Sequence, residues 1–221
     1  MFKKLFGRGD TSAEAPAQNP DRILDNPGKL ATGDAIVIGF DEHRELSNAE
    51  LFVEKVSGLD LAAKSGYERR LLHLGQTSDH RPLLMWLHNE GAGEQLAFAY
   101  GAAQPHVEAM MNVEQFAELF TPDRDYLVEV DSLAQAADNP WIADKYVQDQ
   151  AHEVYWLDGD PNDLKATSRM SNDEQACDYF RLSSKDKTAA IEVFVFDGGR
   201  TDVYFINYLP LYKIETMMPG A

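Results

Sequence analysis

The clearest pattern of apolar positions lies near the C-terminus, where two short runs flank a turn. Residues 191–196 and 201–206 are rich in β-branched and aromatic side chains, and Asp197-Gly198-Gly199-Arg200 separates them. This pattern is typical of a β-hairpin. Because both runs are nearly continuous in apolar character, we expect the hairpin to lie in the middle of a sheet.

Earlier apolar runs predict further strands, at residues 35–39, 67–74, 83–88 and 95–100. Polar or glycine-rich turns separate the last three, so we expect an antiparallel meander. The stretch at 48–57 is ambiguous. Its apolar residues alternate imperfectly, as in a strand, whereas Ser47-Asn48-Ala49-Glu50 resembles a capping box that begins a helix. Both interpretations stay open.

The best helix pattern covers residues 112–120. Asn112 can cap the helix, Gln115 stands at the capping-box position, and the apolar residues that follow share one face before Pro122 ends the pattern. We expect one or two more helices within residues 132–150, interrupted at Asn139-Pro140, with Trp141 and Tyr146 as packing residues.

These elements predict an α+β fold, a predominantly antiparallel sheet with a few short helices and the C-terminal hairpin central to the sheet. Residues 8–29 are rich in Pro, Ala, Asn, Asp and Gly and show almost no apolar periodicity, which predicts a flexible linker. The chain therefore divides into an N-terminal segment, 1–29, and one globular domain, 30–221.

Charge narrows the classes of partner. The formal net charge is −17, so the protein repels the phosphate backbone and nucleic acid is excluded as a partner. Residues 123–163 hold eleven carboxylates and two basic residues, a net charge of −9. Such a segment is either a solvated surface or a docking surface for a basic protein partner.

Cysteine content and the N-terminus indicate the compartment. Cys177 is the sole cysteine, which suits a reducing compartment. The N-terminus lacks the apolar core of a secretory signal, and no apolar run is long enough to span a bilayer. We therefore expect a cytoplasmic protein.

The acidic cluster at the end of the 123–163 segment has the alternating oxygen side chains of a calcium loop. However, Asp163 replaces the glycine of the sharp turn and Arg169 replaces the closing carboxylate, so we predict a solvated turn and no metal. Tyr155 and Trp156 precede it and are able to stack on a ligand. The candidate partner or ligand surface consists of Tyr155, Trp156, Asp158, Asp160 and Asp163.

Motifs of catalysis and cofactor binding do not occur in the sequence. The six histidines show no zinc-ligand spacing, and nothing around Cys177 marks it as a nucleophile. Glycine-rich nucleotide fingerprints and the serine-hydrolase elbow are also missing. We therefore predict no catalytic residues and no cofactor.

The first eight residues combine apolar and basic side chains, the composition of a weak interfacial anchor. The candidate membrane contacts are Phe2, Lys3, Lys4, Leu5 and Phe6. Such a contact would place the protein at the periphery of the inner membrane. The alternative is a tail, or a helix that docks on the acidic body.

Several segments together resemble a known family. They are Leu30-Ala31-Thr32-Gly33-Asp34, the stretch 53–61 followed by Arg70, the Tyr155-Trp156 pair, and residues 175–182. In these the chain resembles the YjfK-like family of uncharacterised bacterial proteins. The family has no established activity, so the resemblance transfers neither an activity nor catalytic residues to this chain. Because members tend to be encoded near membrane-stress coiled-coil proteins, it implies a partner-binding role near the inner membrane.

The sequence thus favours a non-enzymatic interaction module. The alternative is a cation- or small-ligand-binding protein, or an enzyme without a recognised motif, that uses the 155–163 region.

Overall fold

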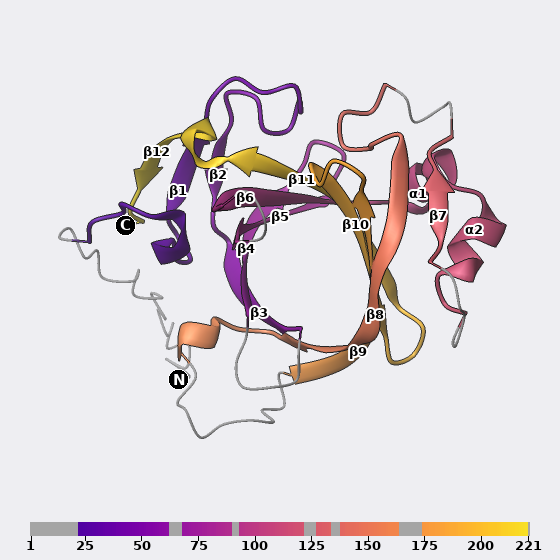
Figure 1. Cartoon of the computed structure of the whole chain (residues 1–221). Coiled ribbons are helices and arrows are strands. Elements are labelled where there is room, and N and C mark those ends of the chain that lie inside the picture. The colour runs from indigo at the N-terminus through magenta and orange to yellow at the C-terminus, as the bar shows by residue number, and fades with distance from the viewer. Residues whose placement is uncertain are drawn as a thin grey trace, which may run out of the picture.

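A computed structural model describes residues 22–61, 68–89, 93–121, 127–133, 138–163 and 174–220. Its main feature is a β-barrel (Figure 1). The barrel strands are β3 (Lys55–Asp60), β4 (Arg69–Gln76), β5 (Pro82–His88), β6 (Gln95–Gly101), β8 (Lys145–Leu157), β9 (Glu174–Ser184), β10 (Ala189–Phe196) and β11 (Thr201–Pro210).

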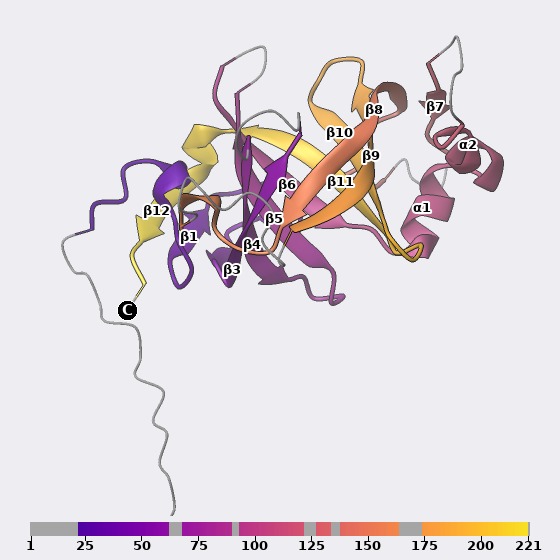
Figure 2. The same ribbon diagram turned by 90° about the horizontal axis from the view of Figure 1, so that it is seen from below.

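Antiparallel pairing runs around the barrel in the order β3-β4-β5-β6-β11-β10-β9-β8. The ring closes where β3 pairs with the end of β8, with Gly58 opposite Leu157 and Asp60 opposite Tyr155. The beginning of β8 pairs instead with β7 (Glu129–Asp131). One long strand therefore closes the barrel and also carries an extra strand beside it (Figure 2).

The expected α+β class is wrong, because the protein is mostly β and its main sheet closes on itself. The predicted hairpin at 191–206 is present as β10 and β11, and each arm also pairs with a second neighbour, β9 or β6. A closed sheet has no central and edge strands, so the hairpin is one part of a continuous wall. The closure depends on a pairing between residues almost one hundred positions apart, which local patterns do not carry.

Both faces of the barrel wall are buried over much of its area. Inside, all eight strands contribute to one cluster that includes Leu59, Trp86, Val154, Tyr179 and Phe194. An eight-stranded barrel is just wide enough for side chains to fill it. This burial explains the nearly continuous apolar runs of β5, β6, β10 and β11, which need apolar residues on both faces.

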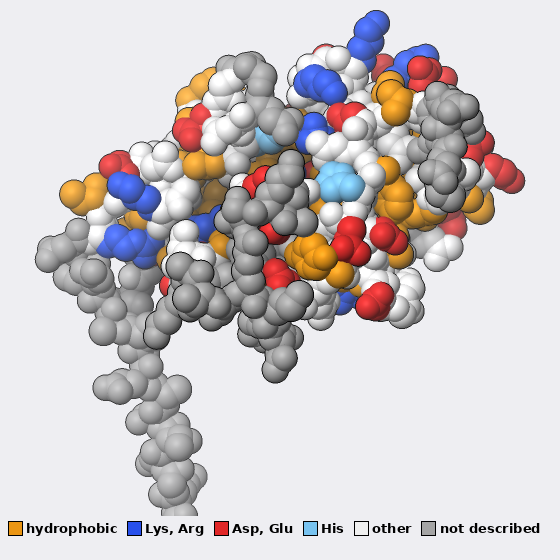
Figure 3. All heavy atoms as spheres, turned by 60° about the horizontal axis from the view of Figure 1, so that its bottom comes forward, with side chains coloured by type: hydrophobic (Ala, Val, Ile, Leu, Met, Phe, Trp, Pro, Cys, Tyr) orange, Lys and Arg blue, Asp and Glu red, His pale blue; other side chains and the backbone are white. Residues whose placement is uncertain are grey.

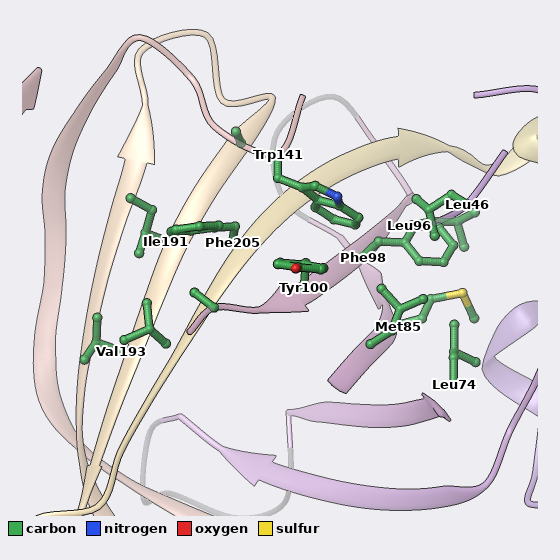
Figure 4. Close-up of a cluster of buried hydrophobic side chains, with 14 of the residues drawn as sticks. Leu46, Leu74, Met85, Leu96, Phe98, Tyr100, Trp141, Ile191, Val193 and Phe205 are labelled. Atoms are coloured by element: carbon green, nitrogen blue, oxygen red, sulfur yellow. The ribbon is translucent and has the colours of Figure 1, made fainter. Parts of the chain in front are cut away.

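Outside, a second cluster covers part of the wall (Figure 4). Tyr100 of β6 stacks on Trp141 with ring centroids 5.5 Å apart, and Phe98, Met85 and Phe205 line the same face. The covering layer includes a small sheet of β12 (Ile214–Met218), β1 (Ala35–Ile38) and β2 (Glu50–Phe52), in that order. The helices α1 (Gln104–Met110) and α2 (Val113–Glu118) lie at the opposite end of the molecule from this sheet (Figures 1 and 2).

The helices expected within residues 132–150 are wrong for the described part of that stretch. Its end forms the first half of β8, in which Tyr146 and Gln148 are buried while Lys145 and Asp149 are exposed. This alternation has a period of two, which belongs to a strand. The prediction that Trp141 and Tyr146 are packing residues is confirmed, since they are 3% and 1% exposed.

The ambiguous stretch 48–57 forms strands, the whole of β2 and the start of β3, and not a helix. The helix at 112–120 is confirmed with shorter bounds, as α2. The side chain of Asn112 accepts a hydrogen bond from the Gln115 backbone at 2.8 Å, and the side-chain oxygen of Gln115 accepts one from the Asn112 backbone at 3.2 Å. No helix in the described part of the chain has the length and apolar character of a membrane span.

The described end of the expected linker, residues 22–29, packs against the rest of the fold. Pro27–Lys29 forms a short 3-10 helix, Pro27 is buried, and Arg22 pairs with the buried Asp34. Residues 22–29 therefore belong to the packed structure, while the remainder of the predicted linker lies outside the described residues.

Candidate functional site

The predicted acidic surface at the end of β8 is joined to the barrel by its own ion pairs. Asp158 pairs with Lys55 of β3. Asp160 accepts two hydrogen bonds from Arg70 of β4, from Nε to Oδ1 at 2.9 Å and from a terminal nitrogen to Oδ2 at 2.5 Å. Burial raises the pKa of Asp160, but these bonds outweigh it and the pKa is lowered. Asp163 remains exposed.

The two aromatic residues of that surface separate. Trp156 packs on the lumen cluster, with its ring centroid 5.4 Å from that of Phe194. Tyr155 is the next residue of the strand, and its hydroxyl donates to Glu153 at 2.7 Å. Because successive side chains of a strand point to opposite faces, the two rings do not form one stacking platform.

The acidic segment 123–163 receives basic partners from elsewhere in the chain. Besides Lys55 and Arg70, Arg181 and Lys187 lie 3.4 Å and 3.3 Å from the carboxylate of Asp149. The charge separation seen along the sequence is therefore partly cancelled in space. Asp123 and Asp125 lie outside the described residues, as do the candidate membrane contacts Phe2, Lys3, Lys4, Leu5 and Phe6.

The lumen contains a buried ion pair that crosses the barrel. Arg69 of β4 lies opposite Glu192 of β10, four strands away in either direction around the ring. One guanidinium nitrogen donates to both carboxylate oxygens, at 2.9 and 2.7 Å, and the hydroxyl of Tyr179 donates to Oε1 at 2.7 Å. The guanidinium carbon lies 4.4 Å from the ring centroid of Trp86.

The protonation states in this cluster follow from its contacts. Burial lowers the pKa of Arg69, but the charge and hydrogen bonds of Glu192, together with the charges of Tyr179 and Tyr208, outweigh burial and the pKa is raised overall. Burial and the Glu192 charge both raise the pKa of Tyr179. The guanidinium therefore stays charged and the phenol neutral, and both groups hydrogen-bond to the Glu192 carboxylate.

A serine–histidine contact also lies on the lumen side of β3 and β4. The hydroxyl of Ser57 is 2.8 Å from Nε2 of His73. Burial, together with the charge of Lys55, lowers the pKa of His73 to about 4. Although this distance suits a nucleophile and its base, Ser57 is fully buried and cannot meet a substrate in this structure.

The described residues offer neither a metal site nor a reactive cysteine. They hold no group of three or more His, Cys, Asp or Glu side chains placed to bind a metal ion. Cys177 lies in the lumen cluster, and burial raises the pKa of its thiol to about 12. A neutral, buried thiol is a poor nucleophile.

An open apolar groove lies between α1, α2 and the start of β11. Its volume is about 330 Å³. The lining residues are mostly apolar and comprise Ala102, Gln104, Val107, Glu108, Met111, Asn112, Val113, Phe116, Thr201 and Val203. Val113, one of the lining residues, is 70% exposed. The groove can receive a few apolar side chains.

The helices around the groove carry only negative formal charge. Residues 102–121 contain Glu108, Glu114 and Glu118 and no lysine or arginine. Glu108 lines the groove itself and accepts a hydrogen bond from Gln104 at 2.7 Å. On the face shown in Figure 3, acidic side chains lie across the right-hand and lower part, and basic ones mainly at the left and upper edges. The right-hand end is the end that carries α1 and α2.

Sequence reasoning missed this groove because it missed α1. Two residues separate Gln104-Pro105 from the end of β6, and a proline at the second position suits a helix start. Val107, Met110 and Met111 are spaced three and four residues apart, which is the signal of a helix face. That short pattern was the available clue.

Known proteins add no further constraint on this site. No family model matches the chain, and neither a curated protein nor a solved structure matches it. The assignment of the site therefore depends on its geometry and chemistry.

Proposed function

We propose that the protein is a non-enzymatic interaction module whose α1–α2 groove receives the apolar face of a basic amphipathic segment from a protein partner. The observation that carries this proposal is the groove itself, an open and mostly apolar depression with the carboxylate of Glu108 in its lining. Helix-in-groove recognition uses an apolar face for affinity, and opposite charge for orientation and association rate.

The interior chemistry favours a binding role over catalysis. A nucleophile must reach its substrate, whereas Ser57 and Cys177 are both buried in the barrel wall and lumen. The cation- or ligand-binding alternative at 155–163 loses support because Asp158 and Asp160 already pair with Lys55 and Arg70.

The first candidate partner follows from the resemblance to YjfK-like proteins. Their members tend to be encoded near membrane-stress coiled-coil proteins, and coiled-coil chains present amphipathic helices. A membrane-stress coiled-coil protein is therefore our first candidate, and it would bring this protein to the inner membrane.

Site-specific photocrosslinking in living cells of the native host tests the proposal. A photoreactive amino acid replaces Val113 in the groove in one variant and Asp163 on the earlier candidate surface in a matched variant. Both positions are exposed, so neither replacement disturbs packing. Mass spectrometry then identifies the crosslinked chain and peptide.

We expect crosslinks from position 113 to a basic, apolar peptide of a protein, and none from position 163. Crosslinks from position 163 alone would assign binding to the 155–163 surface instead. The absence of crosslinks from position 113 would contradict the proposal.

A further inference from the structure

We propose that the α1–α2 groove binds the N-terminal octapeptide of a second copy of this chain, so that the protein associates with itself through its tails. This inference rests on the proposed function, and it names a second copy of this chain, in place of the coiled-coil candidate, as the occupant of the same groove.

The octapeptide has the chemistry that the groove requires. Phe2, Leu5 and Phe6 are spaced three and four residues apart, so a helical turn presents them on one face. Lys3, Lys4 and Arg8 fall on the other side of such a turn. The apolar face matches the lining by Val107, Met111 and Val113.

The charges of the two surfaces are complementary. The octapeptide carries three basic side chains and no acidic ones. Around the groove, the carboxylates of Glu108, Glu114, Glu118 and Asp202 outnumber two basic side chains, Arg200 beside Thr201 and Arg81, which donates to the carbonyls of Gly101 and Ala102. Attraction of this kind steers the tail to the correct groove and penalises acidic segments. It also predicts that the association weakens as salt rises.

The length of the chain indicates a second copy and not the same molecule. From residue 6, the last apolar residue of the octapeptide, to residue 22 the chain spans at most about 58 Å when fully extended. A globular chain of this size has a diameter of about 45 Å, and a path over half its circumference is about 70 Å. Residue 22 begins the described chain beside β1 and β12, at the opposite end from α1 and α2 (Figures 1 and 2). A tail therefore falls short of its own groove and can reach that of a neighbour.

Two full-length variants separate the two halves of the contact. The tail variant is Phe2→Ser/Leu5→Ser/Phe6→Ser, which keeps the groove. The groove variant is Val113→Lys, which keeps the tail and places a charged side chain against its apolar face. Analytical ultracentrifugation follows wild type and both variants from low to several hundred micromolar, and circular dichroism checks their folding.

We expect wild type to associate, and each variant alone to show an apparent dissociation constant raised at least about tenfold. Mixing the two variants restores a 1:1 complex, because the intact tail of one meets the intact groove of the other. Neither misfolding nor docking of a tail on its own molecule produces such rescue.

Three outcomes overturn the inference. Wild type that stays monomeric at every concentration has no such contact. Association that both variants retain uses another surface. If the mixed variants form no 1:1 complex, the tail of one copy does not bind the groove of another.

A failure of this inference can be told apart from a failure of the proposed function. If purified wild type is monomeric while position 113 still crosslinks to another protein in cells, the groove is a docking site for a different partner. If position 113 crosslinks to nothing, both proposals fail.

Discussion

The barrel lumen and the groove beside it are both lined with apolar side chains, yet the polar side chains of the lumen are shielded from water and those of the groove are solvated. In the lumen, Arg69, Glu192 and Tyr179 satisfy one another and are shielded from water. In the groove, Gln104, Glu108 and Asn112 lie at an open, solvated edge, and Val113 is left exposed. The lumen is therefore a place where changes cost stability, and the groove a place where changes cost binding.

The physical reason is that the two surfaces lose their water in different events, folding for the lumen and partner binding for the groove. A lumen side chain has exchanged water for protein contacts during folding, so its removal leaves a cavity or an unpaired charge. A groove side chain keeps most of its water and loses it only when a partner binds. The predictions below test this difference, from the largest effect to the smallest.

Removal of one member of the lumen ion pair should have the largest effect. We expect Arg69→Met to lower the free energy of unfolding by about 3–5 kcal/mol, because Glu192 then remains buried without its cation. Urea denaturation measures the change. The double variant Arg69→Met/Glu192→Leu should recover most of the loss, since apolar replacement removes both charges together. If Arg69→Met were as stable as wild type, the ion pair would not stabilise the fold.

Acidification should act on the lumen through His73. Its pKa is lowered to about 4 in the folded protein by burial and by Lys55, against about 6.5 in an unfolded chain. Between these values the unfolded state binds more protons, so stability falls as pH falls through this window, by up to about 3 kcal/mol.

The matched variant His73→Gln isolates this contribution. Urea denaturation from pH 7.5 to pH 4 should show that wild type loses up to about 3 kcal/mol more than the variant. Parallel pH dependences of the two proteins would mean that His73 is not held neutral by its surroundings.

A pair of valine truncations compares the two regions directly. Val154 is fully buried in the lumen, and Val113 is 70% exposed at the groove. We expect Val154→Ala to cost about 1–3 kcal/mol of unfolding free energy and Val113→Ala less than about 0.5 kcal/mol. Thermal and urea denaturation of both variants measure this. Equal losses would remove the distinction between a stability region and a binding region.

Local signals in the sequence predicted several elements well. The hairpin β10–β11 combined β-branched runs with a Gly-Gly turn, and α2 carried a capping box that the structure confirms. Local signals failed at β8. Its run of polar residues, which includes Gln148, Asp149 and Gln150, looks like a solvated helix until its neighbours are known.

The candidate surfaces show the same limit. Asp158 and Asp160 formed an acidic cluster in the sequence, but residues about ninety to one hundred positions earlier, Lys55 and Arg70, lie beside them. Conversely, the groove joins residues 102–116 to Thr201 and Val203, which are far apart along the chain.

By itself the sequence determined the strand-forming runs, the α2 cap, the acidic balance and the basic, apolar N-terminal octapeptide, because each depends on neighbouring residues. The tertiary structure alone decided that β3 meets β8 to close a barrel, that Arg69 meets Glu192 across it, and that α1, α2 and β11 enclose a groove. These contacts join segments distant in sequence, and the burial that favours them exists only when the whole wall has formed.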